Sequence, residues 1–132
     1  MANSYHLDIS LARETWAALS SFERGYIETA MWLLTDDDGH SLDYLGLHDV
    51  GAGALASMHE DCENFHKLCE EVGLDLRDNY SGGHDFYLTR NRHGAGFWEG
   101  PWGESGPFLA DLAHTFGKTS WYLGDDNMIH VA

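Results

Sequence analysis

The residues best suited to chemistry lie in residues 80–102, with the sequence YSGGHDFYLTRNRHGAGFWEGPW. This stretch combines two histidines, one aspartate, two arginines and several aromatic residues in a chain that is otherwise strongly acidic. A histidine beside a carboxylate is a candidate general acid–base pair, and His84 directly precedes Asp85. Whether the two can act together depends on the element that carries them.

The pattern of this stretch predicts a β-hairpin rather than an active site. Residues alternate with a period of two in HDFYLTR and AGFWE, and the intervening NRHG suits a tight turn. We therefore predict a structural hairpin over Gly83–Glu99, with Phe86 and Phe97 in the core and His93 at a solvated turn. Neighbouring side chains of a strand point to opposite faces, so a hydrogen bond within the histidine–aspartate pair is not expected.

A second candidate is a row of ionisable residues at steps of four, three and four: His59, Glu63, His66 and Glu70. Glu63-x-x-His66 has the spacing found in di-iron helical bundles, but such a site needs a second copy of the motif and further glutamates. Zinc is also disfavoured, because the histidines and cysteines of this helix spread over about 15 Å and cannot converge on one tetrahedral centre. We predict no metal, no cofactor and no catalytic residue; a small enzyme that depends on histidine, aspartate and arginine is the less favoured alternative.

Apolar residues at three- and four-residue steps predict three helices. The first covers residues 8–39, with a break near Gly25 that Ser21 could cap, and it ends at the acidic TDDDG. The second covers residues 54–73 and the third residues 106–117. Residues 119–131 form a second hairpin that turns at GDDN.

The order of these elements is two helices, a hairpin, a helix and a hairpin. We predict a single domain, residues 1–132, of the α+β class. Its two N-terminal helices and its third, short helix should pack on one face of a small antiparallel sheet made of the two hairpins.

Charge is the strongest compositional signal. The 132 residues hold 22 acids against 7 lysines and arginines, a net charge of −15. Residues 1–79 account for 16 acids and 4 bases, a net of −12. Such a field repels nucleic acids and anionic membranes and attracts basic surfaces, so we expect no direct nucleic-acid or membrane binding.

The expected compartment is the cytoplasm. No apolar stretch is long enough for a membrane span, and the N-terminal MANSYHLDIS is not a secretory signal. Cys62 and Cys69 lie too far apart on one helix to pair, so we interpret both as reduced thiols.

Four segments carry a resemblance: FERGYIETAMWLLTDDDG, MHEDCENF, GHDFYLTRNRHGAGFWEG and YLGDD. Together they resemble a family of small, acidic, uncharacterised proteins encoded by bacteriophages, over nearly the whole chain. Tyr87 and Arg92 depart from it, since the family pattern would have tryptophan and glycine there. The resemblance implies a phage origin, a host-cytoplasm setting and an action on a host component, and it implies no reaction.

These observations lead to a hypothesis about the partner. We expect the chain to bind the basic surface of a host nucleic-acid-binding protein of the restriction, CRISPR or transcription machinery, and to modulate or inhibit it as a DNA mimic. The expected partner-binding residues are the acids of the N-terminal half: Asp36, Asp37, Asp38, Asp43, Asp49, Glu60, Asp61, Glu63, Glu70 and Glu71. The alternative is a structural or regulatory phage protein that binds through aromatic residues such as Trp98 and Trp102.

Overall fold

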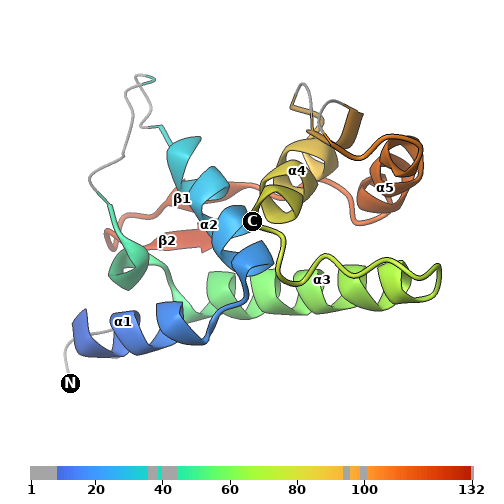
Figure 1. The fold of residues 1–132 in the computed structure, drawn as a ribbon. Coiled ribbons are helices and arrows are strands. Elements are labelled where there is room, and N and C mark those ends of the chain that lie inside the picture. Colours follow the sequence, from blue (N-terminus) through green and yellow to red (C-terminus); the bar gives the residue numbers. More distant parts are fainter. Residues whose placement is uncertain (1–8, 36–38, 40–44, 94–95, 99–100, 132) are drawn as a thin grey trace.

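The computed structural model describes residues 9–35, 39, 45–93, 96–98 and 101–131 (Figure 1). Five α-helices, two short 3-10 helices and two strands follow one another along this part of the chain. They are α1 (Ile9–Ala18), α2 (Ser21–Trp32), η1 (Leu47–Asp49), α3 (Ala52–Glu70), α4 (Tyr80–Arg90), η2 (Gly96–Trp98), α5 (Ser105–His114), β1 (Trp121–Leu123) and β2 (Ile129–Val131). Among these residues no helix has the length and apolarity needed to cross a membrane.

The helices expected in the N-terminal segment and at residues 106–117 are confirmed in type, the latter as α5. The N-terminal segment is broken into α1 and α2, but the break does not lie at Gly25, which is inside α2, and Ser20, rather than Ser21, caps the second piece. α2 ends at Trp32, earlier than expected. The Ser20 hydroxyl accepts a hydrogen bond from the Glu23 amide at 3.1 Å, and the Glu23 carboxylate accepts one from the Ser20 amide at 3.1 Å. This reciprocal capping box satisfies two amides that a helix start leaves unpaired.

The predicted hairpin over Gly83–Glu99 is wrong, and with it the predicted sheet of two hairpins. Most of that stretch belongs to α4, which Asn79 caps by accepting a hydrogen bond from the Gly82 amide at 2.8 Å. Seven of the eleven α4 residues are buried. A helix covered on most sides needs no polar stripe, so it lacks the 3.6-residue periodicity by which sequence patterns reveal helices.

The second hairpin is confirmed. β1 and β2 pair antiparallel, with Tyr122 opposite His130. β2 also meets the start of α3, where the Gly51 amide donates to the Ile129 carbonyl at 2.8 Å. The fold is therefore α+β, but within the described residues its only sheet has two strands.

The core forms where α2, α3 and α4 meet, and α5, which lies beside α4, contributes to it (Figure 1). α2 and α4 approach closely because a Cβ on Gly83 would overlap the Phe22 carbonyl oxygen, and one on Gly25 would overlap the Tyr80 carbonyl oxygen. A glycine at each of these points lets the two backbones touch. Phe65 and Phe86 stack at the centre, with ring centroids 4.3 Å apart.

Candidate functional site

The five acids expected on the outer arc of α3 do not form one row. At 100° per residue, Glu60 and Glu71 fall on the same line of the helix and both are exposed. Glu63 and Glu70 lie on a neighbouring line and turn toward Arg77. Asp61 lies on another side of the helix and faces α4.

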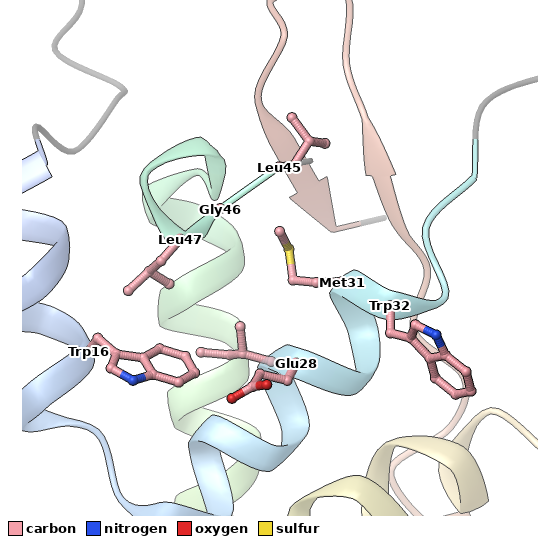
Figure 2. Close-up of a pocket in the computed structure, with 8 residues that line it drawn as sticks. Trp16, Glu28, Met31, Trp32, Leu45, Gly46 and Leu47 are labelled. Atoms are coloured by element: carbon pink, nitrogen blue, oxygen red, sulfur yellow. The ribbon is translucent and has the colours of Figure 1, made fainter. Parts of the chain in front are cut away.

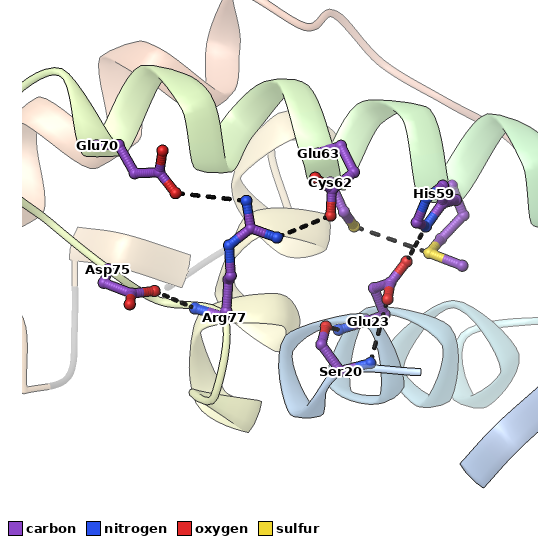
Figure 3. Close-up of polar contacts among 9 residues, drawn as sticks. Ser20, Glu23, His59, Cys62, Glu63, Glu70, Asp75 and Arg77 are labelled. Atoms are coloured by element: carbon purple, nitrogen blue, oxygen red, sulfur yellow. Dashed lines mark hydrogen bonds and ion pairs between the residues drawn. The ribbon is translucent and has the colours of Figure 1, made fainter. Parts of the chain in front are cut away.

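Arg77 holds two of the predicted partner-binding acids. Its guanidinium lies 3.0 Å from a Glu63 carboxylate oxygen and 3.4 Å from one of Glu70 (Figure 3). Burial opposes ionisation of Glu63, but the hydrogen bond and the charge of Arg77 outweigh it and hold the pKa of Glu63 below its usual value. Because all three side chains are partly exposed, this cluster adds little stability, yet it fixes where two negative charges sit.

Asp61 is half-buried and paired with an arginine of α4, so it does not belong to a free acidic face. Its carboxylate lies 2.7 Å from the guanidinium of Arg90, whose side chain is 4% exposed. The same guanidinium donates to the Tyr26 hydroxyl at 3.1 Å and to the carbonyls of Phe116 and Gly117 at 3.1 and 2.9 Å. Arg90 thereby ties α4 to α2, to α3 and to the segment after α5.

The remaining predicted acids divide into three groups. Asp36, Asp37, Asp38 and Asp43 lie outside the described residues. Asp49 is half-buried and accepts a hydrogen bond from the Gly46 amide at 2.8 Å, so it shapes the η1 turn. Glu60 and Glu71 are free to face solvent.

Two acids of this region were missed by the sequence reasoning. Asp75 and Asp78 follow α3 directly, are exposed, and flank Arg77 in the loop that leads to α4. Asp75 also accepts a hydrogen bond from the Arg77 amide at 3.1 Å (Figure 3). We define the α3 acidic surface as the exposed acids of this helix and loop: Glu60, Glu70, Glu71, Asp75 and Asp78.

Exposed charge is strongly unequal over the described residues. Eleven exposed acids are Glu14, Glu28, Glu60, Glu70, Glu71, Asp75, Asp78, Glu104, Asp111, Asp125 and Asp126. Only Lys67, Arg92 and Lys118 are exposed bases among the side chains that are described. Arginine is scarce at this surface because Arg77 and Arg90 are engaged with the chain's own acids, and Arg24 donates to the Trp16 and Ala17 carbonyls.

A pocket of about 410 Å³ opens between α1, α2 and the η1 turn (Figure 2). Trp16 closes it on the α1 side, Met31 lies on α2, and Leu47 projects from the η1 turn. Of the eight lining residues in the described part of the chain, seven are uncharged and the eighth is Glu28. Trp32, at its edge, is 67% exposed, the largest exposed fraction of any large apolar side chain in the described part.

The histidine–aspartate pair of α4 is hydrogen-bonded, contrary to expectation. His84 Nδ1 lies 3.0 Å from Asp85 Oδ1, because a helix allows the contact that a strand forbids. Trp102 Nε1 donates to the other Asp85 oxygen at 2.6 Å. Asp85 is buried and joins α4 to the start of the α5 region, so its geometry is that of a structural anchor with His84 at the rim.

The row His59, Glu63, His66 and Glu70 does not converge. His59 Nδ1 lies 2.7 Å from the capping residue Glu23 (Figure 3), while the two glutamates contact Arg77. His66 points inward and packs against Phe22, with ring centroids 4.5 Å apart. Over the described residues no three histidine, cysteine or carboxylate side chains gather as metal ligands do.

Trp98 and Trp102, the residues of the aromatic alternative, differ in environment. Trp98 is 60% exposed, whereas Trp102 packs on Phe97 and is held by Asp85. Of these two tryptophans, only Trp98 is therefore well exposed to a partner. Comparison of the chain with protein-family models, with curated proteins and with solved structures finds no match.

Proposed function

We propose that this chain is a phage-encoded binding protein that attaches to the basic surface of a host nucleic-acid-binding protein and hinders it. The observation that carries the proposal is the excess of eleven exposed acids over three exposed bases in the described residues. A surface of this kind raises the local concentration of cationic partners and speeds their association. The α3 acidic surface is the densest described part of it, with four acids between residues 70 and 78.

The arginines that pair with acids of the same chain support this proposal. Arg77 and Arg90 bind acids of the same chain, so they are not presented to polyanions. The molecule therefore offers few groups that could neutralise phosphates, on which nucleic-acid binding depends. Binding of a basic protein is the interaction that the distribution of charge favours.

The net charge of the chain supports binding to a basic surface, whereas the spacing of its acids does not reproduce that of DNA phosphates. A DNA strand carries one charge every ~3.4 Å, and five acids spread along α3 would match that density. Asp61 is turned inward and Glu63 is paired, so the exposed acids of α3 are Glu60, Glu70 and Glu71. The spacing along this helix no longer supports mimicry of a strand, while the net charge still supports competition for a basic groove.

The test is affinity capture with competition. The chain is immobilised, exposed to bacterial lysate at low salt, and washed with rising salt or with duplex DNA. We expect nucleic-acid-binding proteins to be retained and to be released by both washes, because exposed charges are screened over about 8 Å at physiological ionic strength. Proteins that remain bound through both washes, or no retained protein at all, would contradict the proposal.

The aromatic interface is the second candidate, and the exposure of Trp98 favours it. Aromatic residues are enriched in the parts of interfaces that contribute most affinity. Binding of this kind would resist salt, so the same washes separate the two candidates.

A further inference from the structure

We infer that the pocket between α1, α2 and the η1 turn receives an arginine side chain of the basic partner, with the aliphatic stem on its apolar wall and the guanidinium on Glu28. The inference rests on the proposed function and adds to it the residue that anchors the partner. It concerns a site distinct from the α3 acidic surface, built from other elements of the chain.

The shape of the pocket fits a long side chain. Its volume of about 410 Å³ lies within the roughly 300–1,000 Å³ of ordinary ligand pockets. Trp16, Met31 and Leu47 contribute apolar side chains to its wall, which is more apolar than polar. Such a wall suits methylene groups, which lose contact with water on entering.

The position of the single charge selects the ligand. Glu28 is exposed and is the one charged residue of the lining among the side chains that the structure describes (Figure 2). Its carboxylate also acts on the Tyr80 phenol, whose pKa is raised first by burial and then by the negative charge of Glu28. An apolar wall that ends at a carboxylate complements a side chain that is apolar along its stem and cationic at its tip.

Arginine meets these requirements better than lysine. A guanidinium can bind a carboxylate through two parallel hydrogen bonds and can stack on an aromatic face. The chain already shows such a contact beside the pocket, since the Arg24 guanidinium lies 5.6 Å from the ring centroid of Trp16. The net charge of −15 adds a favourable field for any cation that approaches.

The experiment uses two neutral-capped amino acids as probes: N-acetyl-arginine methylamide and its citrulline counterpart, which has nearly the same shape but no charge. Each is titrated into the labelled full chain while the amide and indole N–H signals are followed by NMR. We expect the arginine probe to shift the Trp16 indole and the amides of Glu28 and Leu47 in a saturable way. The citrulline probe should bind about tenfold more weakly, the ratio that corresponds to about 1.4 kcal/mol.

Two matched variants test whether the affinity for the arginine probe depends on the carboxylate of Glu28. Glu28→Gln removes the pocket carboxylate and should weaken the arginine probe to the level of the citrulline probe. Glu104→Gln makes the same change in net charge at an exposed position before α5, an element that does not line the pocket and lies away from α1 (Figure 1), and it should leave the affinity within about twofold, since exposed distant charges are screened.

Equal shifts with both probes, no shift in the pocket, or undiminished binding to Glu28→Gln would overturn the inference. These outcomes are independent of the capture experiment. If lysate proteins are captured and released by DNA while the arginine probe fails, the pocket assignment alone is wrong. If the probe binds while nothing is captured, the pocket remains a cation site and the proposed function fails.

Discussion

α3 and α4 are consecutive helices that differ in how much of their surface is buried and in the groups that they bury. α3 buries one face, made of Ala54, Met58, Cys62, Phe65, His66 and Cys69, and its other residues are half-buried or exposed. α4 is buried on most sides and encloses polar groups: Asp85, Thr89 and Arg90 are all less than 9% exposed. The first helix is stabilised by apolar burial along a stripe, whereas the second depends on hydrogen bonds that complete a buried polar network.

α3 and α4 also end in the same backbone motif, but a different type of residue takes the left-handed conformation in each. After α3, Gly73 takes the left-handed conformation (φ 79°), and the amides of Gly73 and Leu74 bond back to Glu70 and Cys69. After α4, Arg92 takes the same role with φ 57°, and the amides of Arg92 and His93 bond to Thr89 and Leu88. Both are Schellman motifs, and only the first has the glycine that favours one.

The largest expected effect on stability is that of Arg90, and it should far exceed the effect of the partly exposed Arg77. Arg90→Ala should lower the free energy of unfolding by about 3–5 kcal/mol, because Asp61, Tyr26 and two carbonyls would lose a buried partner. Arg77→Ala, which breaks the exposed cluster on α3, should cost less than about 1 kcal/mol. Urea denaturation of both variants measures this difference, and similar losses would contradict the contrast.

Glycine substitutions should have opposite signs in the two helices. Gly83→Ala places a methyl group against the Phe22 carbonyl, so it should destabilise the fold by about 3 kcal/mol, at the upper end of overpacking costs. Gly53 is exposed on α3, with nothing within 4 Å of an added Cβ. Gly53→Ala should stabilise by about 0.5 kcal/mol. Thermal melts of the pair give both signs, and a neutral Gly83→Ala would show that α2 and α4 can separate.

His66 provides a pH test of the buried side of α3. Both of its ring nitrogens are buried without a hydrogen-bond partner in the described structure. Burial, aided by the charge of Arg77, lowers the pKa of His66 below 6.5, against the opposing carboxylates of Glu63, Glu23 and Asp75. The unfolded chain therefore takes up this proton first as the pH falls.

The free energy of unfolding should therefore fall as the pH drops below 6.5, until the pKa of His66 in the folded chain is reached. Above pH 6.5, His66 should make no contribution to the pH dependence. The slope from one proton is at most about 1.4 kcal/mol per pH unit. Comparing the wild type with His66→Leu isolates this residue from the other histidines. An identical pH dependence in the two proteins would show that His66 titrates normally.

The smallest expected effects on stability come from the left-handed residues that end α3 and α4. Arg92→Gly should raise the free energy of unfolding by about 1 kcal/mol, since a non-glycine residue pays that much for the left-handed conformation. Gly73→Ala, the reverse change at the end of α3, should lower it by a similar amount. Chemical denaturation of both variants is sufficient, and a destabilising Arg92→Gly would reveal a contact of the arginine side chain that outweighs its strain.

The same contrast explains what the sequence could predict. α3 was predicted closely because its stripe of buried residues has helical periodicity, and α5 and the β1–β2 hairpin because their end and turn residues are typical. α4 was mispredicted because its burial depends on partners far away in sequence, such as Asp61 for Arg90. Local patterns carry no information about such pairs.

The candidate site shows the same limit. Charge composition predicted an acidic surface, and Glu60, Glu70 and Glu71 are exposed as expected. Composition could not predict that Asp61 turns inward, because that depends on where α4 lies. The pocket was also missed, since it brings together α1, α2 and η1, and only the folded chain places their residues side by side.

The most direct test of the central claim is the association rate of the captured partner with charge-matched variants. One variant neutralises the α3 acidic surface, with Gln or Asn at Glu60, Glu70, Glu71, Asp75 and Asp78. Its control neutralises five exposed acids elsewhere: Glu14, Glu104, Asp111, Asp125 and Asp126. Both carry the same net charge, and a third variant, Trp98→Ala, removes the exposed aromatic residue.

Stopped-flow measurements at low and physiological salt should show that the first variant associates about tenfold or more slowly, because steering accounts for factors of that size or larger. The control should be slowed far less, and the wild-type rate should fall as salt rises. Equal slowing of both acid variants would place the effect in net charge rather than in the α3 acidic surface. Loss of binding in Trp98→Ala, with the acid variants unaffected at every salt concentration, would contradict the account and assign the interface to Trp98.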